Sequence, residues 1–280
     1  MSISLDRSTT AAKRRAFRAL HDGPAILVVP NCWDVISARV YEDAGFPAVA
    51  TSSAGLANSL GYSDGNVLDV DLHLATLERM VRALDVPLSA DVESGYAPDV
   101  RALEDFVRRL DETGVAGYNL EDTLYEQDIF PLDEAASRVA AAKRAAPDLF
   151  LNARTDVYLA QIGAPETRFA ETVARLRAFA EAGADGVFVP GVADAETIRK
   201  LAAAVPLPLN VLAGPTLPDA AALQRLGVRR VSVGSSAMRR TLGVLRGIAH
   251  ELRDSGTFSF TREPSVSYAE ANRLVRDRDG

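Results

Sequence analysis

Two carboxylates lie two residues apart at the end of an apolar stretch that begins after Pro87. The stretch 88–91 predicts a buried strand. Residues i and i+2 of a strand face the same side, so Asp91 and Glu93 should point the same way. Two neighbouring carboxylates that both stay charged repel each other, and a hard divalent cation such as Mg²⁺ removes that repulsion. The alternative is a pair of solvated loop acids, and this stretch alone does not decide between them.

The same spacing recurs at the ends of the next two predicted strands, as Asn119 with Glu121 and Asn152 with Arg154. Buried parallel strands are normally lined by Val, Ile and Leu, and loop acids placed by chance would not repeat one spacing on three neighbouring strands. We therefore predict a Mg²⁺ site formed by three carboxylates: Asp91, Glu93 and Glu121. Such a site keeps several waters and few direct carboxylates, and Mn²⁺ could replace Mg²⁺ in it.

Arg154 can act in two ways at this place. It can neutralise Glu121 or Asp91, which is a structural role. Beside a cation, its guanidinium can also bind a substrate carboxylate through two parallel hydrogen bonds. A cation and an arginine together can hold a 2-oxo acid and stabilise its enolate. Asn210, on a later predicted strand, adds a further polar side chain to the same edge.

Scarce residue types exclude other enzyme classes. A Schiff-base aldolase needs a lysine in its site, and a zinc aldolase needs histidine ligands. The lysines and histidines all fall on predicted helices: Lys13, Lys143, Lys200, His21, His73 and His250. The one cysteine, Cys32, ends the first predicted strand, where packing explains it better than catalysis.

The elements that would position these residues alternate along the chain. Apolar runs predict eight buried strands, over 25–30, 48–51, 87–91, 115–120, 149–153, 185–189, 207–212 and 228–233. The helices predicted after them cover 34–44, 69–84, 98–113, 132–146, 165–182, 194–204, 218–226 and 236–252. Continuous apolar strands are typical of a parallel sheet covered by helices, and eight such units in about 250 residues favour a TIM (β/α)8 barrel. A doubly wound open sheet is the alternative, but no Gly-x-Gly-x-x-Gly follows any strand.

We expect one domain over residues 1–280, with an N-terminal helical segment 1–23, a barrel over 24–254 and a C-terminal tail over 255–280. The tail should contain a short helix over 268–276. Segments of this kind either contact other subunits or fray.

The composition is that of a globular protein, with 48% hydrophobic and 25% charged residues. The formal net charge of −7 argues against a nucleic-acid partner. No apolar run is long enough to span a bilayer and no signal peptide is recognisable, and a single cysteine fits a reducing compartment. We expect a cytoplasmic protein without a membrane partner.

The motifs of residues 30–238 resemble those of the isocitrate lyase/phosphoenolpyruvate mutase superfamily. The segment 91–96, Asp-Val-Glu-Ser-Gly-Tyr, resembles its Asp-x-Asp-x-Gly-Tyr metal motif with Glu in the second acidic place. Leu-Glu-Asp at 120–122 and Asn-Ala-Arg-Thr-Asp at 152–156 resemble two further motifs. Ser-Ser-Ala at 52–54 and the segment 60–64 resemble its carboxylate-binding turn and the acid that follows it.

The resemblance implies a role for each matching residue. Asp91 would be the direct ligand of Mg²⁺, while Glu93 and Glu121 would act partly through water. Ser52, Ser53 and Ala54 would hold the substrate carboxylate, and Arg154 would stabilise the enolate oxygen. Catalytic roles are expected for Arg154, Asp64 and Glu121, and substrate contacts for Ser52, Ser53, Ala54, Asp91, Tyr96, Asn119, Arg154 and Asn210. Members of the superfamily are typically tetramers that exchange their last helix, so a homo-oligomer, tetramer or dimer, is expected.

The chain departs from the superfamily in the segment 121–131. The lyases carry a Cys-Gly-His loop there and the mutases a Lys-Thr-Asn loop, whereas this segment has no Cys, His or Lys. The mutase histidine after the sixth strand corresponds to Pro190. These differences argue against isocitrate lyase itself and weaken the case for a phosphonate mutase.

Three functions stay open. The first is a Mg²⁺-dependent lyase that cleaves a C–C bond of a small 2-oxo acid or related dicarboxylate, as an oxaloacetate decarboxylase or a 2-oxo acid lyase does. The second is P–C chemistry on a substrate such as phosphonopyruvate. The third is a barrel that binds a metabolite without catalysis, against which the complete set of acids argues.

Overall fold

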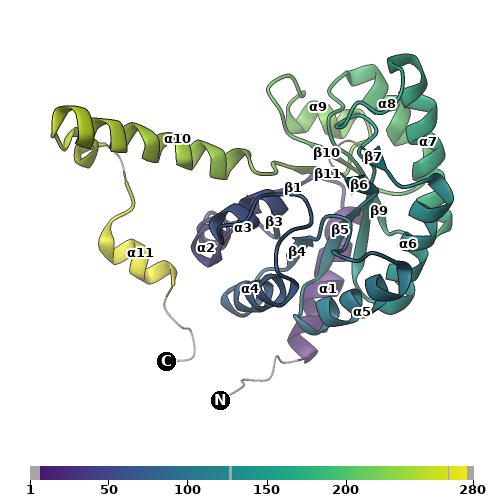
Figure 1. Cartoon of the computed structure of the whole chain (residues 1–280), viewed down its shortest axis with the longest axis horizontal. Coiled ribbons are helices and arrows are strands. Elements are labelled where there is room, and N and C mark those ends of the chain that lie inside the picture. Colours follow the sequence, from purple (N-terminus) through teal and green to yellow (C-terminus); the bar gives the residue numbers. More distant parts are fainter. Residues whose placement is uncertain (1–6, 126–127, 264, 276–280) are drawn as a thin grey trace.

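The computed structural model describes residues 7–125, 128–263 and 265–275, which form a closed barrel of parallel strands with helices around it (Figure 1). The first strand is split at Pro30, which has no N–H to donate to a ladder. Its first half, β1 (Leu27–Val29), pairs with β11 (Arg230–Ser232), and its second half, β2 (Asn31–Cys32), pairs with β3 (Val49–Thr51). Pairing on both sides closes the sheet, so the predicted TIM barrel is confirmed.

The other barrel strands follow in sequence order around the sheet. They are β4 (Leu88–Asp91), β5 (Gly117–Glu121), β8 (Phe150–Arg154), β9 (Gly186–Val189) and β10 (Leu209–Leu212). The covering helices are α2 (Val35–Asp43), α4 (Val70–Ala83), α5 (Val100–Glu112), α6 (Leu132–Ala145), α7 (Pro165–Glu181), α8 (Ala195–Ala204) and α9 (Ala220–Arg225). Five of them begin after an aspartate whose carboxylate accepts a backbone N–H of the first turn: Asp34, Asp69, Asp99, Asp194 and Asp219.

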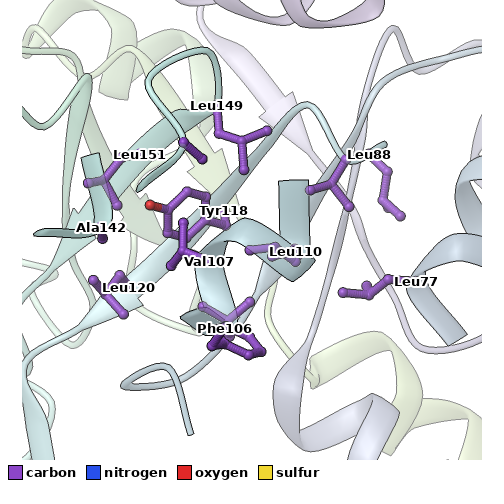
Figure 2. Packing of buried hydrophobic residues seen from close by; sticks show 14 of the residues in the cluster. Leu77, Leu88, Phe106, Val107, Leu110, Tyr118, Leu120, Ala142, Leu149 and Leu151 are labelled. Atoms are coloured by element: carbon purple, nitrogen blue, oxygen red, sulfur yellow. The ribbon is translucent and has the colours of Figure 1, made fainter. Parts of the chain in front are cut away.

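The main core lies between the strands and these helices. Leu88, Tyr118 and Leu151 point outward from three neighbouring strands and pack with Leu77, Phe106 and Leu110 of the helices (Figure 2). This layer fixes the strands against one another and therefore fixes the side chains at their carboxyl ends.

The N-terminal helix α1 (Arg7–Asp22) closes the amino-terminal end of the barrel. Its Phe17 is fully buried against Phe150, and the ring of His21 stacks on Phe150 with 3.9 Å between centroids. Gly117 makes this packing possible, because a Cβ there would lie 2.6 Å from the Phe150 carbonyl oxygen and 2.9 Å from the Phe17 ring.

Two elements near the strand ends were not predicted. The short helix α3 (Ser53–Ser59) starts directly after β3, and β6 (Thr123–Tyr125) pairs with β7 (Asp128–Ile129) as an antiparallel hairpin after β5. Residues 126 and 127 of the segment 121–131 lie outside the described part of the chain.

The last predicted barrel helix lies elsewhere than expected. α10 (Ser236–His250) projects away from the barrel instead of covering it (Figure 1), and Met238 is its one buried residue. A π turn (Glu251–Ser255) and a 3-10 turn (Ser259–Arg262) follow, and the chain returns so that α11 (Tyr268–Leu274) packs on α2. The end of the helix predicted over 268–276 lies outside the described residues. No helix in the described ranges is long and apolar enough to cross a membrane.

Candidate active site

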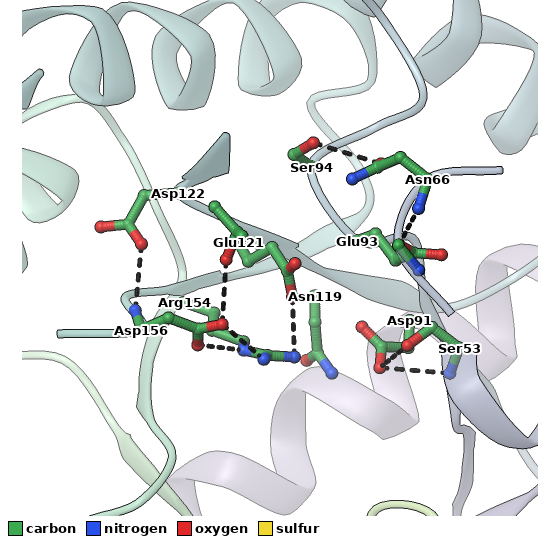
Figure 3. Close-up of polar contacts among 12 residues, drawn as sticks. Ser53, Asn66, Asp91, Glu93, Ser94, Asn119, Glu121, Asp122, Arg154 and Asp156 are labelled. Atoms are coloured by element: carbon green, nitrogen blue, oxygen red, sulfur yellow. Dashed lines mark hydrogen bonds and ion pairs between the residues drawn. The ribbon is translucent and has the colours of Figure 1, made fainter. Parts of the chain in front are cut away.

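The predicted polar pairs meet at the carboxyl ends of neighbouring strands. In the sheet register Asp91 lies opposite Asn119, Asn119 opposite Asn152, and Glu121 opposite Arg154. Parallel pairing in register brings pairs far apart in the sequence to one end of the barrel (Figure 3). This is the end at which barrel enzymes carry their active sites.

One carboxylate oxygen of Asp91 is hydrogen-bonded, and the other is unpaired among the described residues. One carboxylate oxygen, Oδ2, accepts hydrogen bonds from the backbone N–H of Ser53 at 3.3 Å and from its hydroxyl at 3.1 Å. The backbone N–H of Asp91 donates to the hydroxyl of Thr51. Oδ1 is buried and has no hydrogen-bond partner among the described residues. An unpaired buried carboxylate oxygen is costly, so this atom is the natural ligand for a cation.

The turn that carries Ser53 is fixed by Ser52. The Ser52 hydroxyl accepts the N–H of Gly55 and caps α3, while β3 ends at Thr51. The sequence Ser52–Ser53–Ala54 therefore passes directly from a strand into the first turn of a helix. This turn lies beside Asp91, so the structure brings the predicted carboxylate-binding residues to the predicted metal ligand.

Glu93 lies beyond β4, which ends at Asp91, so the strand alternation expected for this pair does not extend to it. The residue has a positive φ of 51°, and its Oε2 accepts the backbone N–H groups of Gly65 and Asn66, while Oε1 accepts the hydroxyl of Tyr96. Burial, and next the charge of Asp64, raise the pKa of Glu93 to about 7. Glu93 thus anchors the loop that follows α3, and both of its oxygens already have partners.

Asp64 and Tyr96 occupy different places. Asp64 lies at the rim on the loop that Glu93 anchors, and partial burial together with the charge of Asp91 raises its pKa. Tyr96 bonds to Glu93 and packs edge-on against His73 and Phe106, toward the helix layer. The substrate contact of Tyr96 stays a prediction, and in this structure its hydroxyl is engaged by Glu93.

Arg154 lies between two carboxylates (Figure 3). Its Nε and Nη2 donate to the two oxygens of Asp156 at 2.6 and 2.7 Å, and its Nη1 pairs with Glu121 at 2.7 Å. Burial alone would lower the pKa of Arg154, but Asp156 and Glu121 raise it well above its usual value. Burial raises the pKa of Glu121, and Arg154 opposes that shift. The guanidinium stays charged and is held in one orientation.

A third carboxylate, that of Asp122, supports Asp156. Asp122 accepts the backbone N–H of Asp156 at 3.0 Å through one oxygen and Nη1 of Arg175 at 3.0 Å through the other. Thr123, the first residue of the hairpin, donates its hydroxyl to Asp156. Sequence reasoning gave Asp156, Asp122 and Arg175 no role, although Asp156 repeats the two-residue spacing after Arg154.

Asparagines form the floor of the site. Asn152 donates to Asn119 at 2.9 Å, and Asn210 is hydrogen-bonded to Ser232 at 3.4 Å. Both asparagines predicted to bind substrate, Asn119 and Asn210, are fully or almost fully buried in the barrel interior. They lie beneath the mouth and can contact only a ligand that reaches the floor.

The carboxylates do not form a preassembled cage. Within residues 7–125, 128–263 and 265–275, no three His, Cys, Asp or Glu side chains converge on one point where a metal could bind. The free oxygen of Asp91 nevertheless fits Mg²⁺, which takes oxygen ligands and keeps most of its waters. The metal roles of Asp91, Glu93 and Glu121 stay a prediction, with Asp91 as the direct ligand.

Comparisons with known proteins find relatives of this chain by sequence and by fold. The profile of the family described as phosphoenolpyruvate phosphomutase matches residues 17–253. An uncharacterized protein of Mycobacterium tuberculosis (strain ATCC 25618 / H37Rv) is 38% identical over 261 residues, 93% of this chain and 96% of the relative. Oxaloacetate decarboxylase of Pseudomonas fluorescens (strain SBW25) is 31% identical over 239 residues, 81% of this chain and 80% of the relative. The solved structure of 2,3-dimethylmalate lyase, 26% identical, covers 94% of this chain and 95% of its own, with a TM-score of 0.83.

Proposed function

Because the chain belongs to the phosphoenolpyruvate phosphomutase family, within the isocitrate lyase/phosphoenolpyruvate mutase superfamily, we propose that it is a Mg²⁺-dependent lyase. Its substrate would be a small 2-oxo acid or related dicarboxylate. The cleaved bond would be the C–C bond between C3 and its substituent, whose electrons remain as an enolate. The observation that carries the proposal is the unpartnered Oδ1 of Asp91, with the Ser53 turn beside it and Arg154 at the same end of the barrel.

Asp91 would hold the metal directly, and Glu93 and Glu121 would orient waters around it. The bound Mg²⁺, or Mn²⁺ in its place, would draw electron density from the ketone oxygen of the substrate and so favour cleavage. Glu93 has both oxygens engaged with Gly65, Asn66 and Tyr96. Besides orienting water, Glu93 would therefore fix the loop of Asp64 beside the site.

Arg154 would supply hydrogen bonds to the oxygen on which negative charge develops. Asp156 fixes its guanidinium before substrate arrives, so no reorientation is needed during the reaction. The backbone and hydroxyl of the Ser52–Ala54 turn would bind a substrate carboxylate. Asn119 and Asn210 would limit how deep the substrate goes.

Decarboxylation of oxaloacetate fits the chain best among the reactions of this class. The segment 121–131 carries no Cys, His or Lys that could protonate the enolate. Decarboxylation tolerates this, because CO₂ leaves without needing a proton and solvent can protonate the remaining enolate. The curated oxaloacetate decarboxylases at 29–31% identity support the same choice.

The test is pyruvate release from oxaloacetate with Mg²⁺, with EDTA, and with the Asp91→Ala variant. Mg²⁺ alone decarboxylates oxaloacetate slowly, so the variant provides the background rate. Turnover that needs both the metal and Asp91 is expected. Equal rates for the wild type and Asp91→Ala would refute the oxaloacetate assignment, and Mg²⁺ binding by the wild type would then direct the search to larger 2-oxo and 2-hydroxy diacids.

The family match itself favours one further candidate, cleavage or rearrangement of a phosphonate such as phosphonopyruvate. Incubation of the enzyme with Mg²⁺ and phosphonopyruvate, followed by a phosphate assay and phosphorus NMR, distinguishes hydrolysis and rearrangement from no reaction. The absence of the mutase loop in 121–131 makes the C–C reaction the first choice.

A further inference from the structure

A buried arginine that sequence reasoning missed lies in the interior of the barrel. Arg230 is on β11, opposite Asn210 in the register, and is 1% exposed. Its Nη2 lies 3.4 Å from the hydroxyl of Ser89 and 3.5 Å from Oδ1 of Asn119. The side chain therefore reaches across the interior to the strands that carry Asp91 and Glu121.

Few hydrogen bonds and no ion pair among the described residues offset the buried charge of Arg230. Among the described residues, its Nε and Nη1 have no hydrogen-bond partner and no carboxylate lies within 4.0 Å of it. Burial lowers its pKa to about 10, and the charge of Asp91 opposes the shift, so the guanidinium is charged at neutral pH. An unpaired buried charge is expensive. An apolar side chain in the same place would avoid that cost, so packing does not explain an arginine there.

Arg230 has aromatic rings on one side and carboxylates on the other. Below it, on α1, lies the ring of Phe17, 5.7 Å from the guanidinium carbon, and next to that His21. Burial, and then the charge of Arg230, lower the pKa of His21 to about 3, so this neighbour is neutral. Above it lie the carboxylates at the mouth, of which Asp91 acts on it most directly. The charged group with which Arg230 interacts most strongly is therefore Asp91 in the acidic site.

We propose that Arg230 is a positioning residue whose buried positive charge, placed beneath the floor at Ser89 and Asn119, offsets the surplus of carboxylates at the mouth. This inference rests on the proposed function. It predicts opposite effects on the two ligands. The charge weakens binding of Mg²⁺, and it strengthens binding of the anionic substrate that must enter an acidic site.

The test compares wild type with Arg230→Met and Arg230→Lys by calorimetric titration at pH 8 and low ionic strength. The probes are Mg²⁺ alone, and then oxalate, a small dianion, in saturating Mg²⁺. We expect Arg230→Met to bind Mg²⁺ roughly 3–10-fold more tightly and oxalate roughly 3–10-fold more weakly, from Coulomb energies at an intermediate effective dielectric constant. Arg230→Lys keeps the charge and should stay within about 2-fold of wild type for both probes.

The matched control is Arg39→Met, which removes another buried arginine, one that bonds the Leu274 carbonyl on the outside of the barrel. It should lower stability and leave both affinities unchanged. A purely structural Arg230 would make both probes bind more weakly in Arg230→Met, or would make Arg230→Lys as defective as Arg230→Met, and either result overturns the inference. If Arg230→Met does not fold, Arg230→Gln is measured in its place. Failure of the wild type to bind Mg²⁺ would instead refute the proposed function.

Discussion

At the scale of single residues, the site depends on carboxylates with different partners. Four of them lie at one end of the barrel. Asp91 has an unpaired oxygen, and Glu93 accepts backbone N–H groups. Glu121 and Asp156 both pair with Arg154. The hydrogen-bond partners of each carboxylate therefore determine its role. The unpaired oxygen of Asp91 can bind a ligand, and the paired carboxylates hold the neighbouring loop and Arg154 in place.

Asp156 provides the sharpest prediction at this scale. Asp156→Asn removes the charge that fixes the Arg154 guanidinium and leaves Glu121 as its remaining carboxylate partner. We expect kcat to fall roughly 10–100-fold with a smaller change in KM, because the loss is in preorganisation. Steady-state kinetics on oxaloacetate, the substrate proposed above, measures it. Asp105→Asn, which alters an exposed acid, is the control; a KM effect without a kcat effect would contradict the assigned role.

A histidine outside the site should make stability depend on pH. His73 on α4 is fully buried, neither ring nitrogen has a described hydrogen-bond partner, and burial lowers its pKa to about 4. The folded state therefore binds the proton less well than the unfolded chain. The stabilising contribution is complete above pH 6.5 and is lost as the pH falls from there toward 4.

Urea unfolding at pH 7.5 and pH 5 measures the effect. His73 should account for a loss of roughly 1–2 kcal/mol between the two values. His73→Phe should reduce the pH dependence by that amount, since phenylalanine does not titrate and preserves the contact with Tyr96. An unchanged pH dependence in the variant would show that His73 is not the responsible group.

At the scale of elements, the sequence predicted the strands well because continuous apolar runs and Asp caps are local signals. It missed α3 because seven residues, mostly small, show no helical period and follow a strand without a loop. It missed Arg230 because two adjacent arginines, Arg229 and Arg230, lie in the strand predicted over 228–233, and which of them points inward is known only once the register is known. The partners of Glu93 were equally out of reach, since Gly65 and Asn66 are far from it in the sequence.

Gly117 shows how α1 and the barrel depend on each other. Gly117→Ala would place a methyl group against the Phe150 carbonyl and the Phe17 ring, so α1 or β8 would have to move. We expect a loss of about 1–3 kcal/mol or more in the free energy of unfolding. Chemical denaturation measures it, with Gly214→Ala as the control, since no atom lies within 4 Å of a Cβ there. Equal stability of the two variants would show that α1 is loosely packed.

At the scale of the whole molecule, α10 is the feature that a single chain leaves unexplained. Three of its large apolar side chains are about half exposed: Leu242 at 49%, Val244 at 49% and Leu245 at 57%. The sequence predicted a helix over 236–252, but a helical pattern cannot say what covers these side chains. We expect another copy of the chain to cover it and hence a homo-oligomer, as the superfamily resemblance implies.

Light scattering coupled to size-exclusion chromatography tests this expectation. Leu245→Glu should lower the oligomer mass or shift it to the monomer, because a charge would replace an apolar contact. Arg246→Ser, which alters the adjacent exposed residue, is the control and should preserve the mass. A wild-type protein that is monomeric at micromolar concentration would contradict the expectation.

The position of α1 has a consequence for the order in which ligands enter and leave the site. Phe17 and Phe150 obstruct the amino-terminal end of the barrel, and Arg230 with the asparagines occupies its centre. Within the described residues the barrel is therefore blocked at its amino-terminal end, and under the proposed function substrate would enter and both products would leave through the carboxyl-terminal end. The product that lies deeper in the barrel would leave only after the product nearer the opening. That deeper product should consequently compete with incoming substrate, and inhibition by the last product to leave should be competitive.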